Sequence, residues 1–158
     1  MPALAYIGLG ANLGAARETV HAALRDLAAE PHIEIEKVAR LYSSAPIDSS
    51  GPNYVNTVAS IRTSLNPQQL LACLQKIEQW HGRERPYINA PRTLDLDLLL
   101  YDDMTLESPT LTIPHPRMHL RAFVLQPLHD IAGNIRLAQG YVETLLELCQ
   151  DQSLLPMA

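Results

Sequence analysis

The apolar positions of the chain change their spacing several times, and each change marks a separate element. Residues 4–9 form a continuous apolar run that is typical of a buried strand. Residues 16–29 then carry apolar side chains on one face at helical spacing. Residues 33–42 alternate between apolar and polar positions, which predicts a strand, and residues 54–61 are interpreted as another strand.

A second helix is predicted to begin at Asn66 and Pro67, which supply an N-cap and a first-turn proline. Alternating leucines over residues 94–100 predict a strand with one apolar face. Residues 43–53 and 82–92 are predicted loops of more than ordinary length, and such loops often carry function. The order β-α-β-β-α-β predicts an α+β fold, the ferredoxin-like sandwich.

Smaller elements are predicted beyond this core. Residues 111–113 favour a short edge strand, residues 114–117 a rigid turn, and residues 141–150 a final amphipathic helix. Repeats, low-complexity tracts and linkers are missing from the sequence, so we expect one domain over residues 1–158.

The strand over residues 94–100 carries Asp95 and Asp97, two positions apart. Side chains at this spacing leave the same face of a strand, about 6 to 7 Å apart. Two like charges at that distance raise each other's pKa unless a cation lies between them, and Mg²⁺ suits paired carboxylates. A strand with one solvated face is the alternative. The element order predicts a strand inside the sheet, beside the first strand and under the long loops, and this favours the metal site because unpaired buried charge is costly.

The net charge of −5 argues against a general nucleic-acid binder, which normally has a basic face. Ten of the twelve basic residues are arginine, and Arg83, Arg85 and Arg92 lie close together in the sequence. With Arg117 and Arg121 they flank one end of the carboxylate strand. Arginine is well suited to phosphate, so this group indicates a small anionic ligand, and arginine with Mg²⁺ is typical of phosphoryl transfer.

Gly8, Gly10 and Gly14 do not have the spacing of a Walker loop or of a dinucleotide-binding loop, and we interpret them as turn glycines. Any nucleotide must then be held by side chains and metals. Cys73 and Cys149 lie in apolar segments without metal-ligand spacing, which predicts reduced core cysteines of a cytoplasmic protein. The sequence carries no membrane-length apolar stretch and no signal-peptide pattern.

Four further residues have both a structural and a functional interpretation. His115, between two prolines, is either a phosphate donor or a turn residue. Tyr54 and Asn56 share one face of a strand, where Asn56 could bind an amide-like heterocycle edge or be ordinary polar decoration. Phe123 is either a core residue or a stacking surface for a flat ligand.

Three segments, Gly82–Arg85, Ala90–Leu99 and Pro114–Phe123, closely resemble the 6-hydroxymethyl-7,8-dihydropterin pyrophosphokinase family of the folate pathway. The segments Tyr6–Gly14 and Tyr54–Asn56 are similar to the same family. The resemblance implies transfer of pyrophosphate from ATP to the hydroxymethyl oxygen of the pterin, with release of AMP. It also implies two Mg²⁺ ions bound by Asp95 and Asp97.

The resemblance assigns further roles to individual residues. The catalytic residues would be Arg83, Arg92, Asp95 and Asp97. The ATP-binding residues would be Gln75, Glu78, Arg83, Arg85, Arg92, Leu98, Thr112, His115 and Arg121. The pterin-binding residues would be Ser44, Ala45, Pro46, Ile47, Tyr54, Asn56, Asp95 and Phe123. Asn89 stands where some members have a loop tryptophan, and Tyr87 is a candidate replacement.

We therefore expect a monomeric enzyme that acts on small molecules and binds neither nucleic acid nor membrane. Two other classes remain open. A ferredoxin-like regulatory module would bind a ligand without chemistry, and a two-metal nuclease would also use paired acids and Mg²⁺. The module needs no carboxylate pair, and the nuclease would be expected to have a basic surface.

Overall fold

The computed structural model describes residues 2–12, 15–45, 53–82 and 94–157. The fold is a mixed α/β arrangement with an antiparallel sheet, and the described part contains four α-helices. The elements of its first two thirds are β1 (Ala3–Ala11), α1 (Ala16–Ala29), β2 (Ile33–Val38), β3 (Tyr42–Ser44), β4 (Tyr54–Thr63), α2 (Pro67–Trp80) and β5 (Asp95–Tyr101).

The main sheet has the order β10-β3-β4-β1-β5, and β2 also pairs with β4. All of its pairings are antiparallel. β5 lies beside β1 as the sequence predicts, but the expectation that it lies inside the sheet is wrong. β4 occupies one side of β1 and β5 takes the other, so among the described residues β5 is an edge strand of this sheet.

The predicted single strand over residues 33–42 is also wrong, because it is two strands that pair with different parts of β4. Between them the chain leaves regular pairing, and the buried Thr57 hydroxyl donates to the carbonyl oxygens of Ala39 and Arg40, 3.0 and 3.2 Å away. A side chain of the neighbouring strand thus satisfies the carbonyls at the break, and the apolar pattern of residues 33–42 cannot show this contact.

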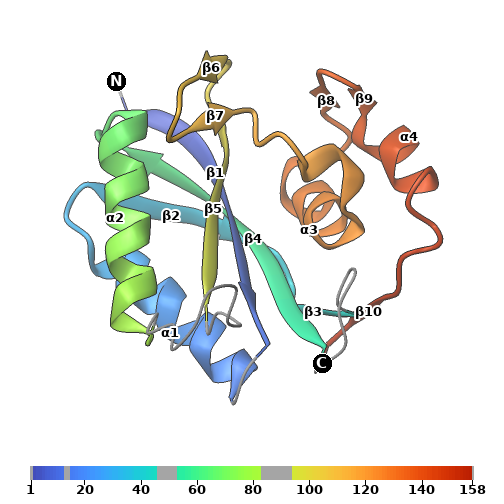
Figure 1. Ribbon diagram of the computed structural model, residues 1–158, viewed down its shortest axis with the longest axis horizontal. Coiled ribbons are helices and arrows are strands. Elements are labelled where there is room, and N and C mark those ends of the chain that lie inside the picture. The colour runs from blue at the N-terminus through green and yellow to red at the C-terminus, as the bar shows by residue number, and fades with distance from the viewer. Residues whose placement is uncertain (1, 13–14, 46–52, 83–93, 158) are drawn as a thin grey trace.

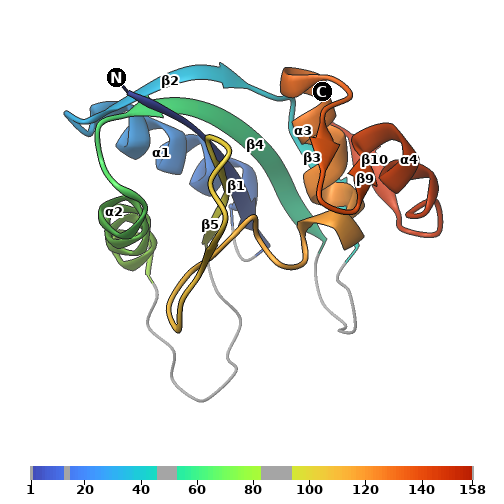
Figure 2. The same cartoon turned by 90° about the horizontal axis from the view of Figure 1, so that it is seen from above.

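Helices α1 and α2 cover one face of the sheet, as Figures 1 and 2 show. The core beneath them includes the predicted inward positions of α2, and Leu70, Leu74 and Ile77 are fully buried. The predicted N-cap is confirmed: Asn66 and Gln69 each accept a hydrogen bond from the other's backbone N–H, both over 2.9 Å.

The opposite face of the sheet is partly covered by α3 (Ala122–Ala132), which the sequence pattern does not predict. Pro127 lies inside this helix, a position that usually ends helices. Leu125 and Leu128 are buried and pack in a second core with Val58 and Leu99 from the sheet. The described part contains no helix that is long and apolar enough to cross a membrane.

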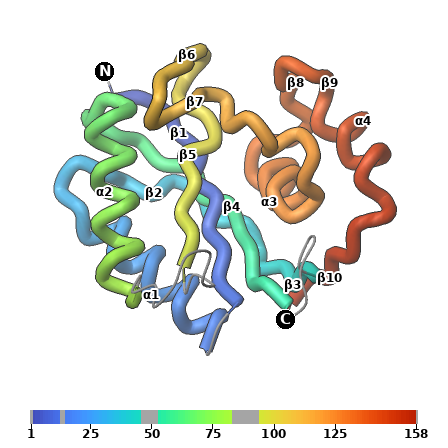
Figure 3. The backbone as a smooth tube through the Cα atoms, viewed as in Figure 1, coloured from blue at the N-terminus to red at the C-terminus, as the bar shows by residue number. Residues whose placement is uncertain are grey.

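The remaining elements are short, and Figure 3 shows their path from β5 to the C-terminus. The predicted edge strand over residues 111–113 is found only as β7, and it pairs with β6 in a separate two-stranded sheet rather than extending the main one. The predicted last helix is shorter than expected. These elements are β6 (Leu106–Glu107), β7 (Thr112–Ile113), the 3₁₀ helix η1 (Met118–Leu120), β8 (Arg136–Leu137), β9 (Gly140–Tyr141), α4 (Val142–Glu147) and β10 (Leu154–Pro156).

Candidate active site

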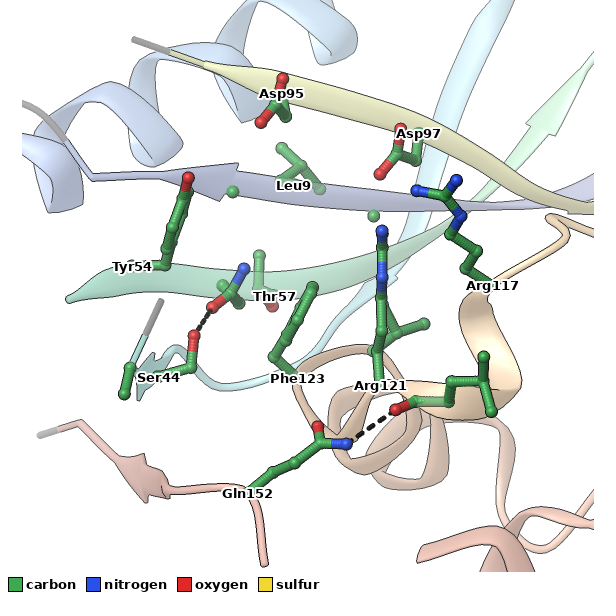
Figure 4. A pocket seen from close by; sticks show the side chains of 16 residues that line it. Leu9, Ser44, Tyr54, Thr57, Asp95, Asp97, Arg117, Arg121, Phe123 and Gln152 are labelled. Carbon is green, nitrogen blue, oxygen red and sulfur yellow. Dashed lines mark hydrogen bonds between the residues drawn. The ribbon is translucent and has the colours of Figure 1, made fainter. Parts of the chain in front are cut away.

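A cavity of about 570 Å³ lies between the open face of the sheet and the segment that leads into α3 (Figure 4). The sheet supplies residues from β1, β3, β4 and β5, and the other wall comes from η1, α3 and the C-terminal segment. Its lining consists of Gly8, Leu9, Gly10, Ser44, Ala45, Tyr54, Asn56, Thr57, Asp95, Asp97, Arg117, Leu120, Arg121, Phe123, Val124 and Gln152.

Asp95 and Asp97 are half-buried and both line this cavity, while the leucines that alternate with them are buried on the other face. The predicted placement of both carboxylates on one face is confirmed. Each pairs across the strands with a glycine of β1, Asp95 with Gly10 and Asp97 with Gly8. A glycine has no side chain to fill the space beside the carboxylate, so the floor of the cavity stays open there.

Those glycines correct a sequence-based expectation. Gly8 and Gly10 are interior residues of β1, paired on both sides, and are not turn residues. At Gly10 an added Cβ would lie 2.9 Å from Nδ2 of Asn56, closer than real Cβ contacts allow. The glycine at this position therefore leaves the room that the Asn56 amide occupies.

Cationic groups face the carboxylates from the segment before α3. Arg117 and Arg121 line the cavity, and in Figure 4 both side chains extend toward the strand that carries Asp97. The guanidinium of Arg121 also stands 5.5 Å from the centre of the Phe123 ring, within cation–π range. The arrangement places two guanidinium groups at the carboxylate end of the cavity, where they can pair with an anionic group such as a phosphate.

His115 is held close to these groups by its backbone and ring. The backbone N–H of His115 donates to the carbonyl of Leu99 over 2.9 Å, and Nδ1 of its ring accepts a hydrogen bond from the backbone N–H of Arg117 over 3.1 Å. Burial lowers the pKa of His115, nearby Asp97 raises it, and the two arginines of the cavity lower it further, with a net decrease. With Nδ1 used as an acceptor, the neutral ring carries its proton on Nε2.

Flat and amide-bearing side chains form the other end of the cavity. Asn56 is buried, and its Oδ1 accepts a hydrogen bond from the Ser44 hydroxyl over 2.5 Å. Tyr54 and Phe123 reach the cavity from β4 and α3. Burial and the nearby charge of Asp95 raise the pKa of Tyr54, which keeps its hydroxyl protonated. This end can hold a planar heterocycle with amide-like edges.

The structure brings together about half of the sequence-predicted site residues. Those that line the cavity are Ser44, Ala45, Tyr54, Asn56, Asp95, Asp97, Arg121 and Phe123. Those that lie outside the described residues are Pro46, Ile47, Arg83, Arg85 and Arg92. The other predicted ATP contacts, which do not line this cavity and stay predictions, are Gln75, Glu78, Leu98, Thr112 and His115.

Two of those residues have a clear place in the fold. Leu98 is buried in the core beneath α1 and α2. Glu78 is buried on α2, and its Oε2 accepts a hydrogen bond from the Leu96 amide over 2.8 Å. This bond links α2 to the strand that bears the aspartates, and the contact of Glu78 with a nucleotide stays a prediction.

The cavity also contains residues that were not predicted to line it, including Gly8, Gly10, Thr57 and Gln152. The two glycines could have been predicted as cavity residues from their positions opposite the two aspartates, but only if the pairing register of β1 and β5 were known. Gln152 lies far from the other site residues in the sequence and carries no local signal.

Comparison with known proteins identifies the kind of enzyme. Residues 6–133 match the family model described as 7,8-dihydro-6-hydroxymethylpterin-pyrophosphokinase (HPPK). The chain is 43% identical over 146 residues to the 2-amino-4-hydroxy-6-hydroxymethyldihydropteridine pyrophosphokinase of Pseudomonas aeruginosa, covering 91% of this chain and 90% of that protein. It is 42% identical over 143 residues to the protein of the same name from Haemophilus influenzae, covering 90% and 89%.

Solved structures agree at the level of the fold. A crystal structure of HPPK-DHPS in complex with substrates superposes with a TM-score of 0.75 at 13% identity, covering 93% of this chain and 43% of that one. A structure of wild-type Plasmodium falciparum HPPK-DHPS gives a TM-score of 0.71 at 14% identity, covering 94% and 41%. The chain thus spans less than half the length of those structures.

The fold and the relatives together define an ATP-dependent pyrophosphokinase. The chain belongs to the HPPK family.

Proposed function

We propose that this protein transfers the pyrophosphoryl group of ATP to 6-hydroxymethyl-7,8-dihydropterin, with release of AMP, as a step of folate biosynthesis. The names of its relatives support the reaction. The observation that carries the proposal is the cavity itself, which has paired carboxylates and arginines at one end and aromatic and amide side chains at the other.

The pterin end of the cavity orients the acceptor. Asn56, held by Ser44, presents its amide to the pyrimidinone edge of the pterin, and Phe123 and Tyr54 contact the flat ring. This placement directs the hydroxymethyl oxygen toward the end of the cavity where Asp95 and Asp97 lie. Ala45, Pro46 and Ile47 complete the pterin-binding residues that we propose.

At the phosphate end the hydroxymethyl oxygen attacks the β-phosphorus in line. A new P–O bond forms, the bond from the β-phosphorus to the bridging oxygen breaks, and AMP leaves with that electron pair. The hydroxyl proton leaves to solvent or to a phosphate oxygen. Arg121, Arg117 and the Nε2–H of His115 donate to phosphate oxygens, so the chain contributes by positioning and electrostatics. Arg83, Arg85 and Arg92 are proposed to join them.

Asp95 and Asp97 fit Mg²⁺ as ligands. Both are half-buried hard oxygen donors that face the same cavity. Mg²⁺ in phosphoryl-transfer sites uses one or two carboxylates and completes its shell with water and phosphate oxygens, so two protein ligands suffice. We propose that Asp95 and Asp97 would hold two ions, which would supply positive charge to the phosphate oxygens.

Further features of the enzyme follow as proposals. The strand order β5-β1-β4-β2, with β3 continuing β2, supports the ferredoxin-like topology. We propose a single domain over residues 1–158 that acts as a monomer. We propose a cytoplasmic location, which the free and buried Cys73 and Cys149 support.

One assay tests the proposed function. The protein is incubated with Mg-ATP and 6-hydroxymethyl-7,8-dihydropterin, and AMP and the pterin pyrophosphate are separated by chromatography. We expect both products in equal amounts, and no AMP when the pterin is left out. ATP turnover that forms ADP, or the absence of AMP, would exclude the proposal. Parallel incubation with DNA and RNA tests the nuclease, and pterin binding without turnover would indicate a ligand-binding module.

A further inference from the structure

The side-chain amide of Gln152 bridges the backbone on both sides of Arg121. Its Oε1 accepts a hydrogen bond from the Ala122 amide over 2.9 Å, and its Nε2 donates to the Leu120 carbonyl over 2.7 Å. Figure 4 shows the second of these bonds. Arg121 has extended backbone angles, with φ −120° and ψ 111°. A primary amide presents a donor and an acceptor together, so Gln152 holds Arg121 much as a neighbouring strand would.

Arg121 lies where the chain passes from η1 to α3, and its carbonyl accepts the first bonds of α3, from the Val124 and Leu125 amides over 3.1 and 3.0 Å. Arg121 is the N-cap residue of α3 but makes no side-chain capping bond. Its own amide donates to the Met118 carbonyl over a long 3.3 Å. The first N–H groups of a helix have no partner within the helix, and Gln152 satisfies the one on Ala122.

The two residues on either side of the Ala122 amide both line the cavity. Arg121 faces the carboxylate end, and Phe123 faces the pterin end, with the guanidinium 5.5 Å from the centre of the ring. Because the backbone at this junction sets the direction of both side chains, a rotation there would displace both groups together.

Gln152 is in turn anchored to the sheet. The backbone N–H of Gln152 donates to the Cys149 carbonyl over 3.0 Å. Two residues later β10 begins, where Leu154 pairs with Ser44 of β3. Ser44 itself lines the cavity. Residues 149–156, the C-terminal strap, therefore connect both walls of the cavity, and they lie outside the residues that match the family model.

We propose that Gln152 is a positioning residue of the enzyme, which acts through Arg121 and Phe123. Its two hydrogen bonds fix the junction before α3 so that the guanidinium and the ring meet the substrates held on the sheet. The inference rests on the proposed function, because it assigns Arg121 to the phosphate and Phe123 to the pterin. It adds a determinant of the reaction from the C-terminal strap.

The test compares Gln152→Met, which keeps the length of the side chain and removes both hydrogen bonds, with Gln150→Met. Gln150 is exposed in the same strap and serves as the matched control. We expect kcat/KM of Gln152→Met to fall by about 10-fold to 100-fold, since two hydrogen bonds and a small displacement of reacting groups each have effects of this order. The KM values for ATP and for the pterin should both rise. Gln150→Met should keep wild-type constants.

A double-mutant cycle with Arg121→Ala separates positioning from plain structural support. If Gln152 acts in part through Arg121, the combined loss in kcat/KM will be smaller than the product of the two single losses. Multiplicative losses, or Gln152→Met with wild-type kinetic constants and only a lower Tm, would overturn the inference.

A second measurement distinguishes failure of this inference from failure of the proposed function. A wild-type protein that forms no AMP defeats the assignment of the reaction, but the hydrogen bonds are still tested by amide exchange of Ala122 in the protein without ligands. We expect slow exchange in the wild type and in Gln150→Met, and faster exchange in Gln152→Met. Equal exchange in all three would show that Gln152 does not hold this junction.

Discussion

Ser44 and Asn56 form a buried hydrogen bond between two neighbouring strands, in which the Ser44 hydroxyl donates to Oδ1 of Asn56 over 2.5 Å. Their strands pair antiparallel, with Ser44 opposite Tyr54 and Tyr42 opposite Asn56. The bond fixes the plane of the amide and leaves its Nδ2 over Gly10 of the third strand. The end of the cavity that we propose for the pterin is therefore shaped by one residue from each of three strands.

Replacing Ser44 with alanine removes the bond and leaves Oδ1 of Asn56 buried without this donor. We expect the free energy of unfolding to fall by about 1–3 kcal/mol. We also expect KM for the pterin to rise several-fold, because the amide loses its fixed orientation, with a smaller effect on KM for ATP. Denaturant unfolding and steady-state kinetics measure the two effects. Ser44→Thr keeps the hydroxyl and should recover most of both; equal losses in the two variants would argue against this role.

Gly10→Ala tests the close approach of the Asn56 amide. The new methyl group would lie 2.9 Å from Nδ2, and the Ser44 bond restrains the amide from moving away. We expect a loss of about 1–3 kcal/mol in unfolding free energy. In Gly8→Ala the nearest atoms belong to Leu99 at 3.5 Å, an ordinary contact, so the loss should be clearly smaller. If the two variants are equally stable, crowding at Asn56 is not the reason for the glycine.

Asp97→Ala tests the proposed metal site. The side chain is half-buried at the cavity, so its removal leaves the folded core in place. We expect kcat to fall by at least about 100-fold, the order seen when one electrostatic group is removed from a reacting centre. Circular dichroism should be unchanged. Full activity with the same Mg²⁺ dependence would rule out Asp97 as a ligand.

The Tyr42–Asp130 contact predicts an alkaline loss of stability. The Tyr42 hydroxyl donates to the Asp130 carboxylate, which joins β3 to α3. Burial, together with this bond and the charge of Asp130, raises the pKa of Tyr42 to about 12. The unfolded chain ionises near its ordinary value of 10.0, so the stabilisation is present below that pH and is lost as pH rises toward 12.

Unfolding titrations at about pH 9 and about pH 11 measure this effect. The wild type should lose more stability across that interval than Tyr42→Phe, which has no hydroxyl to ionise. Absorbance of the tyrosinate form gives an independent reading of the late titration. A wild type and a Tyr42→Phe variant with the same slope would contradict the assignment.

The sequence by itself determined the order of the main elements and the carboxylate face. Alternation places Asp95 and Asp97 together on one side because side chains of a strand alternate between two faces, a local property that any strand obeys. The N-cap at Asn66 and the buried face of α2 follow from local spacing for the same reason. For Phe123 and Asn56 the sequence left two interpretations open: a ligand-binding residue, or an ordinary core residue (Phe123) or polar strand residue (Asn56).

Only the tertiary structure decided what depends on contacts between distant segments. The edge position of β5, the break between β2 and β3, the separate pairing of β7 and the helix around Pro127 all depend on partners elsewhere in the chain. Gln152 shows the same limit most clearly, because its amide meets the backbone beside Arg121 across about thirty residues, as the 30- and 32-residue separations of its two bonds show. Spacing fixes which face a side chain takes, whereas long-range packing fixes what it meets there.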